Sequence, residues 1–458
     1  MLGYPSGSEP HCAAPSPQTV REDRRIPTQL IDLRTPVDRA VLVGAPIRDV
    51  DSRLAEEHLE ELSRLTDTAG GEVVGTLVQR LDRPQPRFYI GEGKAHELRD
   101  LVKETEANLV IFDEELSPAQ GKNLEELLEV RIMDRSELIL DIFATRARSK
   151  EARMQVELAQ LQYLLPRLRR MWSHLSRIRG GIGLRGPGET QLETDRRLVG
   201  LRIADLREKL RTVGRARETQ RKARQGKFRA ALVGYTNAGK SSLLRALSGS
   251  DLFVEDRLFA TLDSATRTVD LGSGYDVLIT DTVGFIRKLP HHLVASFRST
   301  LEEAREADVL LHVIDASHPD WEEQRAVVND VLEDLDLEDR ATILVFNKMD
   351  RMTHAEEDAL RARVRAFEPT PAVFVSALQP ETLEELRETL RARTRARLAH
   401  VRIELEAADG EAIAALHREA EVLQQSGEDT KVRMVARVPA GLLGWISTRP
   451  EVAIEVIQ

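Results

Sequence analysis

The sequence has almost no cysteine and no long hydrophobic run. Cys12 is the only cysteine in 458 residues, which excludes a disulfide framework and a cysteine-built metal site. No apolar run approaches the ~18 to 20 residues that a membrane-spanning helix needs, so stable membrane insertion is not expected. Residues 1–25 lack the apolar core of a secretory signal. With 41% hydrophobic and 31% charged residues, the composition is typical of a soluble globular protein. We expect a cytoplasmic location, with peripheral contact at a membrane as the alternative.

The net charge of -10 hides a strong asymmetry. Residues 145–229 contain 23 Lys and Arg against 8 Asp and Glu, a net charge of +15, and the rest of the chain therefore carries -25. A basic block in an acidic protein favours a polyphosphate partner, either nucleic acid or an anionic membrane. The alternative is a solvated helical face.

A phosphate-binding loop stands near the middle of the chain, at Gly234-Tyr-Thr-Asn-Ala-Gly239-Lys240-Ser241. It lies between the apolar run 230–233 and the helix-like segment 242–247. The glycines let backbone N–H groups face phosphate oxygens, and the helix N-terminus adds the positive end of its dipole. Lys240 is expected to reach the β and γ phosphates, and the Ser241 hydroxyl to ligate Mg²⁺. A chance glycine-rich turn would not explain the flanking strand and helix.

Three further motifs follow predicted strands, and together they specify the nucleotide. Asp281-Thr-Val-Gly284 is expected to hold Mg²⁺ through a water molecule at Asp281 and to contact the γ-phosphate through the Gly284 N–H group. Asn347-Lys348-Met-Asp350 indicates guanine, because its carboxylate accepts two hydrogen bonds from guanine and would stay unpaired beside adenine. Ser376-Ala377 supplies a short turn for guanine O6. The residues predicted to contact GTP are Gly234, Tyr235, Thr236, Asn237, Ala238, Gly239, Lys240, Ser241, Ser242, Asp281, Gly284, Asn347, Lys348, Asp350, Ser376 and Ala377.

A GTP switch also needs a threonine that binds Mg²⁺ and the γ-phosphate and releases both after hydrolysis. We choose Thr261, in Phe259-Ala-Thr261-Leu-Asp263, and Thr266 or Thr268 is the alternative. The predicted catalytic residues are Lys240, Thr261 and Gly284, and the predicted Mg²⁺ ligands are Ser241, Thr261 and Asp281.

The water-positioning Gln of many GTPases is missing after the Asp-x-x-Gly motif, where Phe285 stands instead. Because a phenyl ring cannot bond water, intrinsic hydrolysis should be slow, and a partner, a monovalent ion or the backbone must orient the nucleophile. Asn237 is placed like the Asn that holds K⁺ in some related GTPases. We therefore include K⁺ as a hypothetical second cation.

The alternation of strands and helices predicts an α/β protein in several parts. We expect a disordered leader at 1–25, a small parallel α/β domain at 26–148, a basic antiparallel helical hairpin at 149–226, a P-loop GTPase domain at 227–398 and a small α+β domain at 399–458. In the first domain Asp113 ends a strand, which is the usual place for a ligand-facing side chain. Residues 91–94 resemble half a phosphate loop, but a structural turn is the better interpretation.

The hairpin is predicted from two apolar stripes at helical spacing, 158–175 and 192–213, which two helices bury most cheaply against each other. Between them, residues 179–191 hold five glycines and a proline, and this composition predicts an exposed loop at the hairpin tip. A Gly- and Arg-rich tip can approach a phosphate backbone closely, whereas the alternative is a flexible connector. The candidate RNA contacts are Arg179, Arg185, Arg196 and Arg197.

The motifs together closely resemble those of the HflX GTPases of the TRAFAC class. The resemblance covers about residues 37–380 and includes the tip motif that starts Gly180-Gly-x-Gly183-x-Arg185, the Phe259 to Asp263 segment, and Asp281-Thr-Val-Gly284-Phe285. It implies a ribosome-associated GTPase that binds the large subunit and its rRNA, reaches toward the peptidyl transferase region and splits stalled or idle ribosomes. We expect a monomer off the ribosome. The alternatives are an RNA-binding GTPase without splitting activity, gating a ribosome-assembly or other RNA role, and a membrane-surface GTPase.

Overall fold

The computed structural model describes residues 37–47, 52–178, 187–222, 227–250, 255, 257–272, 274–289, 303–428 and 430–457. For 169–178, 187–192 and 216–222 it describes the backbone alone. Among the described helices, none combines the length and the apolar character needed to cross a bilayer.

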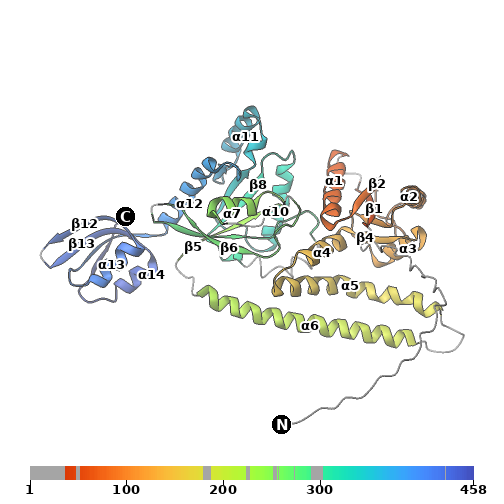
Figure 1. Ribbon diagram of the computed structural model, residues 1–458, viewed down its shortest axis with the longest axis horizontal. Helices are drawn as coiled ribbons and strands as arrows, with labels where there is room; N and C mark the ends of the chain where they lie inside the picture. Colours follow the sequence, from red (N-terminus) through yellow and green to blue (C-terminus); the bar gives the residue numbers. More distant parts are fainter. Residues whose placement is uncertain are drawn as a thin grey trace, which may run out of the picture. The chain divides into compact units, whose positions relative to one another are not determined.

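The first folded part is a parallel sheet with helices on both faces (Figure 1). Its strands, in the spatial order β2-β1-β3-β4, are β1 (Arg39–Gly44), β2 (Glu72–Val78), β3 (Leu109–Phe112) and β4 (Arg131–Asp134). Its helices are α1 (Ser52–Ala69), α2 (Glu92–Glu104), α3 (Pro118–Leu128) and α4 (Arg135–Arg146). Alternate residues of a strand face opposite sides, so Leu42 packs with α1 and α4, whereas Val43 packs with α2 and α3. The predicted parallel α/β architecture is confirmed.

Two local predictions in this part can be checked against the helix ends. Gly91 is the N-cap of α2, and Glu92 to Lys94 already lie in the helix, so the structural turn expected at 91–94 is wrong beyond Gly91. For the next helix, α4, the sequence predicts Ser136 as the N-cap, and this prediction is wrong. The cap is Asp134, whose carboxylate accepts a hydrogen bond from the Glu137 N–H group at 3.0 Å. A charged carboxylate at the helix N-terminus is also favoured by the dipole.

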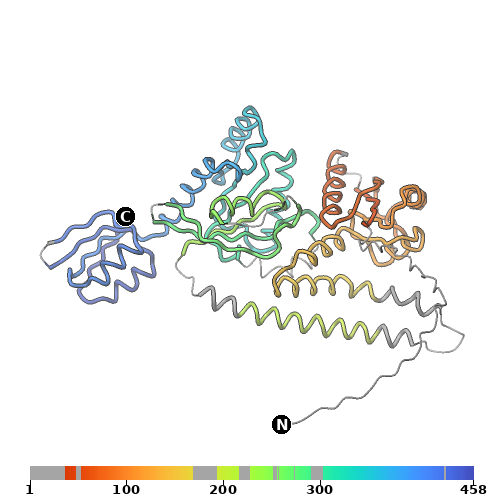
Figure 2. The backbone as a smooth tube through the Cα atoms, viewed as in Figure 1, coloured from red at the N-terminus to blue at the C-terminus, as the bar shows by residue number. Residues whose placement is uncertain are grey.

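Two long helices, α5 (Lys150–Ile178) and α6 (Pro187–Lys222), lie side by side as a hairpin (Figures 1 and 2). They bury a shared apolar seam, formed by Met154, Leu158, Ile203 and Leu206 with Leu161, Leu165, Val199, Leu210 and Val213 at its margins. Pro166 lies inside α5. The expected loop through residue 191 is wrong at its end, because α6 already begins at Pro187, and proline is well suited to a first helical turn. Arg179 and Arg185 lie outside the described residues.

The second α/β part contains a six-stranded sheet in the order β10-β9-β8-β5-β7-β6. Its strands are β5 (Phe228–Gly234), β6 (Ala265–Asp270), β7 (Asp276–Asp281), β8 (Val309–Asp315), β9 (Thr342–Asn347) and β10 (Ala372–Phe374). Its described helices are α7 (Lys240–Ser248), α10 (Trp321–Asp334), α11 (His354–Phe367) and α12 (Glu384–Ala396), with 3₁₀ turns η1 (Met349–Arg351) and η2 (Pro380–Leu383). All neighbours are parallel except β6, which is antiparallel to β7 and was not predicted.

The C-terminal part is an antiparallel sheet in the order β12-β13-β11-β14, with two helices packed on one face. Its elements are β11 (Ala399–Glu406), α13 (Gly410–Glu419), β12 (Glu421–Glu428), β13 (Lys431–Val438), α14 (Ala440–Ile446) and β14 (Ala453–Val456). Helix α13 ends at Glu419, and the following residues form β12. The overall fold class is confirmed, and the exact domain boundaries stay predictions.

Candidate functional site

The phosphate-loop motif lies between the end of β5 and the start of α7, as the sequence predicts. Strand β5 lies between β7 and β8, where the connections of the sheet leave in opposite directions, and such a point is the usual ligand crevice of a doubly wound sheet. Gly239 has φ +93°, and a Cβ atom there would lie 2.3 Å from Asn347 Nδ2. Only glycine therefore fits at this position.

Lys240 is 5% exposed and points back along its own loop. Its Nζ donates hydrogen bonds to the backbone oxygens of Gly234, at 3.0 Å, and Tyr235, at 2.8 Å. Burial lowers the pKa of this amino group to about 8. A buried ammonium held by backbone oxygens at the first residue of helix α7 is well placed to meet an anionic ligand.

Three side-chain oxygens meet next to this lysine. Ser241 Oγ lies 2.6 Å from Thr261 Oγ1 and donates a hydrogen bond to Asp281 Oδ2 at 2.5 Å. Asp281 is 2% exposed, and its Oδ1 has no hydrogen-bond partner among the described residues. Burial raises the pKa of this carboxyl, against the opposing effect of Lys240. A converging set of two hydroxyls and one carboxylate, with one buried oxygen unpartnered, fits the oxygen-ligand preference of Mg²⁺.

The structure brings Thr261 to this cluster and keeps the alternative threonines away from it. Thr266 and Thr268 lie on strand β6, and Thr266 Oγ1 is 2.9 Å from Thr280 Oγ1 on the neighbouring strand. A cleft joins the phosphate loop to the Thr261 segment. The residues that line it are Thr236, Asn237, Gly239, Lys240, Ser241, Ser242, Glu255, Arg257, Phe259, Ala260, Thr261, Thr282 and Gly284.

The predicted base-recognition motifs also meet, at the ends of β9 and β10. Asn347 Nδ2 donates to the Ala238 oxygen at 2.9 Å, and its Oδ1 accepts from the Ala377 N–H group at 3.1 Å. Ser376 Oγ donates to Asp350 Oδ1. Asn347 therefore ties the phosphate loop to the last turn of the site, and Asp350 lies beside that turn.

Lys348 has a partner that the sequence did not identify. Its Nζ forms an ion pair with Asp315 Oδ2 at 2.7 Å, and Asp315 is the last residue of β8. The only sequence signal for Asp315 is its position at a strand end.

Phe285 is 2% exposed and is tied to the phosphate loop through its backbone. Its N–H group donates to the Gly234 oxygen at 3.1 Å, and its oxygen accepts from the Thr236 N–H group at 2.6 Å. At Gly284 a Cβ atom would lie 2.7 Å from Thr236 Cα, so this contact needs glycine. A buried phenyl ring at position 285 cannot orient a water molecule.

Sequence comparisons identify related proteins along most of the chain. Three family models match: "GTP-binding GTPase N-terminal" at residues 56–144, "GTP-binding GTPase Middle Region" at 146–224, and "50S ribosome-binding GTPase" at 229–348. The GTPase HflX of Alkalihalophilus pseudofirmus is 43% identical over 400 residues, which cover 86% of this chain and 92% of that protein. The chain belongs to the HflX family of GTPases.

Other HflX relatives are still closer in sequence over shorter spans. The GTPase HflX of Flavobacterium psychrophilum is 51% identical over 322 residues, covering 70% of this chain and 78% of that protein. That of Escherichia coli is 49% identical over 305 residues, covering 66% and 71%. Membership of the HflX family makes the chain a GTP-hydrolysing enzyme.

A buried charge cluster between α1, β3, α4 and the segment after Gly284 was missed by sequence reasoning. Asp113, at the end of β3, is 2% exposed and contacts three cations: Arg135 at 2.9 Å, Arg287 at 3.1 Å and Lys288 at 2.7 Å. Although a strand end is the usual place for a ligand-facing side chain, arginine and lysine groups occupy both carboxylate oxygens of Asp113. Burial alone would raise the pKa of Asp113, but Arg135, Arg287 and Lys288 outweigh it and hold the pKa below its usual range.

The same cluster extends to the phosphate loop. Glu61 of α1 pairs with Arg135 and accepts a hydrogen bond from the Tyr235 hydroxyl, and its Oε1 lies 3.2 Å from Arg287 Nε. Tyr235 OH in turn accepts from the Arg287 N–H group at 3.1 Å. Burial and the adjacent Glu61 raise the pKa of Tyr235. The two α/β parts thus share a charged contact at the phosphate loop. No local sequence pattern predicts this contact.

Proposed function

We propose that this HflX-family GTPase is a nucleotide switch that binds the large ribosomal subunit and acts on ribosomes, separating the subunits of stalled or idle ones. The observation that carries the proposal is the union, in one chain, of a guanine-type nucleotide site and a hairpin within the +15 block. Arg196 and Arg197 of α6 are both exposed, as a phosphate-backbone contact requires.

At the nucleotide, each predicted residue has a role that its position supports. Lys240 and the loop N–H groups bind the β and γ phosphates, and Asp350 selects guanine. Ser241, Thr261 and Asp281 are the residues that would hold Mg²⁺, which supplies charge neutralisation on the phosphates. Thr261 is the switch residue, because it joins the ligand set from a separate segment of chain.

Hydrolysis in the free protein is slow in this proposal, since Phe285 cannot place the attacking water. The missing orientation comes from the large subunit, with K⁺ at Asn237 as a contributing ion. Equal hydrolysis rates in K⁺ and Na⁺ buffers would remove K⁺ from the proposal.

Sedimentation with a non-hydrolysable GTP analogue tests ribosome binding directly. We expect the protein to co-sediment with large subunits and to shift intact ribosomes toward separate subunits. A double variant, Arg196→Ala with Arg197→Ala, should bind large subunits at least ~10-fold more weakly while keeping its GTP affinity. The reason is that each arginine bound to an RNA phosphate releases counterions from the RNA, and this release favours binding. The matched control is Arg365→Ala with Arg393→Ala, two exposed arginines outside the hairpin.

The outcomes separate the rival functions. Unchanged ribosomes with no co-sedimentation would overturn the proposal. Binding without separation of subunits would leave an RNA-binding GTPase that gates another step. Flotation with anionic vesicles in place of ribosome binding would favour the membrane-surface alternative.

A further inference from the structure

The segment that carries Thr261 also carries a contact to the hairpin, two residues further along. Asp263 Oδ2 accepts hydrogen bonds from the N–H groups of Arg148, at 3.1 Å, and Ser149, at 3.0 Å. Its Oδ1 accepts from the Ser149 hydroxyl. One carboxylate therefore receives three hydrogen bonds from the two residues that immediately precede helix α5.

This contact lies at the N-terminus of the first hairpin helix. Helix α5 begins at Lys150, and Ser149 Oγ also accepts from the Ala152 N–H group at 3.0 Å, as an N-cap side chain does. The first N–H groups of a helix have no partner within it, and the helix dipole favours a negative charge beside them. Asp263 thus extends the cap of α5 from a different part of the chain.

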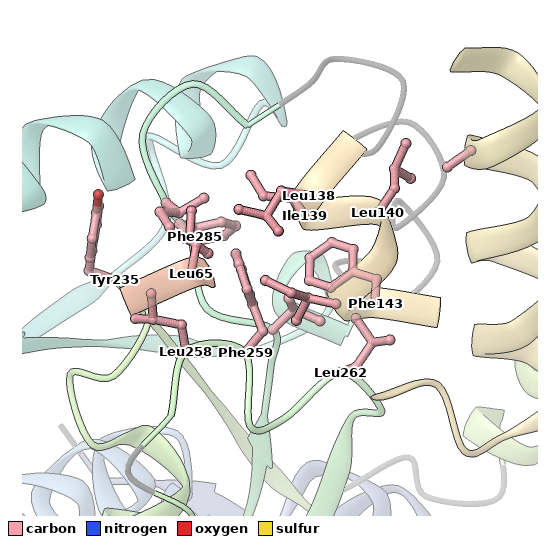
Figure 3. Close-up of a cluster of buried hydrophobic side chains, with 14 of the residues drawn as sticks. Leu65, Leu138, Ile139, Leu140, Phe143, Tyr235, Leu258, Phe259, Leu262 and Phe285 are labelled. Atoms are coloured by element: carbon pink, nitrogen blue, oxygen red, sulfur yellow. The ribbon is translucent and has the colours of Figure 1, made fainter. Parts of the chain in front are cut away.

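The rest of the segment is held on both sides. Phe259 is 2% exposed, and its ring meets that of Phe143 in α4 edge-on, with centroids 4.6 Å apart (Figure 3). Its N–H group donates to Thr236 Oγ1 in the phosphate loop at 3.0 Å. Leu262 is buried in the same apolar cluster. Residues 259–263 therefore contact the phosphate loop and α4 through Phe259, and the start of α5 through Asp263.

A second ion pair links the same regions. Arg146, the last residue of α4, contacts Glu255 Oε2 at 2.6 Å. Glu255 and Asp263 both lie between the phosphate loop and β6. Glu255 contacts the last residue of α4, and Asp263 contacts the two residues before α5. The junction of these helices is thus bound at two points by the segment that carries Thr261.

We propose that Asp263 is a positioning residue that couples the nucleotide state to the hairpin: when Thr261 is bound, Asp263 caps α5, and when Thr261 is released, the cap opens. This inference rests on the proposed role of Thr261 as the switch residue. The physical reason is that two residues span too little chain for Thr261 to leave its ligands while Asp263 keeps three hydrogen bonds of good geometry. Conversely, the cap holds Thr261 beside Ser241 and Asp281.

Hydrogen exchange of the full chain measures the cap directly. In wild type, we expect the N–H groups in peptide 146–153 to exchange about 10-fold more slowly with a GTP analogue than with GDP, in line with loss of hydrogen bonds to a charged acceptor. In Asp263→Ala the two nucleotides should give the same exchange in this peptide. In Asp263→Asn, which keeps the shape and loses the charge, the difference should be reduced.

Two further variants separate the possible failures. Thr261→Ala should also remove the difference at 146–153, whereas Asp276→Ala, which removes an exposed carboxylate at the start of β7, should leave it intact. If nucleotide does not protect peptide 234–241 in wild type, the proposed nucleotide site itself fails. If peptide 234–241 is protected but 146–153 responds equally to both nucleotides, only the coupling is overturned.

Kinetics provide the readout that a merely structural residue would not give. Asp263→Ala should lower kcat for GTP hydrolysis about 10-fold, because Thr261 is less well placed, while the GDP affinity stays within about twofold. An unchanged kcat, or a parallel loss of GDP affinity, would contradict a positioning role for Asp263.

Discussion

Asp350 follows strand β9 and Asp113 follows strand β3, yet their surroundings suit them to different roles. Asp113 is surrounded by Arg135, Arg287 and Lys288, which leave no room for a ligand. The Asp350 carboxylate accepts a hydrogen bond from the Ser376 hydroxyl and forms no ion pair with any described residue. A carboxylate without a cation can still accept hydrogen bonds from a base, whereas one with three cations is part of the framework.

Replacing Asp350 should reduce guanine recognition selectively. Asp350→Ala removes the acceptor proposed for two guanine N–H groups, so GTP affinity should fall about 10- to 100-fold, the range for hydrogen bonds to a charged group. Titration with a fluorescent GTP analogue measures this, with Asp358→Ala, an exposed carboxylate of α11, as the control. Undiminished GTP affinity in Asp350→Ala would refute the assignment.

Replacing Asp113 should act on stability. Asp113→Ala removes one of the two carboxylates, Asp113 and Glu61, that pair with the buried Arg135 and Arg287. Removing one partner of a buried ion pair typically costs about 3 to 5 kcal/mol. Urea unfolding measures the loss. The control is Asp100→Ala, whose side chain is 70% exposed and whose ion pair with Arg99 should contribute at most ~1 kcal/mol. Equal unfolding midpoints for the two variants would show that the cluster does not hold the structure together.

The same residue gives a pH dependence of known sign. The folded-state pKa of Asp113 is below its ordinary value of 3.8, so the unfolded chain binds the proton more readily. The stabilisation is therefore complete above about pH 4 and is lost as the pH falls below that value. In urea titrations at a series of pH values, the free energy of unfolding of Asp113→Ala should therefore fall less steeply below about pH 4 than that of the wild type.

At the scale of single residues, the sequence predicted several of the side chains that the structure brings together around the phosphate loop, because they occupy fixed positions in motifs. Their contacts with a nucleotide stay predictions. The sequence could not predict the partners of Asp113 or Asp263, since both contact residues more than 100 positions away or on another element. Such contacts depend on tertiary packing, which leaves no local pattern.

Among the elements, the phosphate loop shows how one backbone position can decide a function. Gly239→Ala would place a methyl group 2.3 Å from Asn347 Nδ2 and strain a φ of +93°. We expect GTP binding to become undetectable in calorimetry. Gly249→Ala is a matched control, because Gly249 has φ +63° but open space around it, so it should cost stability and leave nucleotide affinity intact. Retained GTP binding in Gly239→Ala would contradict the close packing of the loop.

The elements that the sequence predicted share strong periodicity. The buried strand β8 and the apolar seam of α5 and α6 have clear patterns. Strands β6 and β12 were missed because their residues are mostly polar or partly exposed, so period-2 alternation is weak. The start of α6 was missed because Gly188 and the proline suggested a loop, although proline suits a first turn.

For the whole molecule, the sequence predicted the α/β class and the paired helices, and it missed how the parts meet. Phe285 and Phe259 were interpreted as switch-motif residues, whereas the structure packs both in one apolar cluster with Leu65 and Phe143 of the first α/β part (Figure 3). The segments proposed to respond to GTP are thus covered by another part of the chain. A partner that moves the first α/β part would therefore also disturb the packing of these segments beside the nucleotide site.

The rate of GTP hydrolysis by the full chain, measured with and without purified large ribosomal subunits, tests the central claim most directly. Because Phe285 supplies no group to orient water, we predict a slow rate alone and an increase of at least ~10-fold with large subunits, with no comparable increase from small subunits. An equal rate in the presence and absence of large subunits would contradict the account.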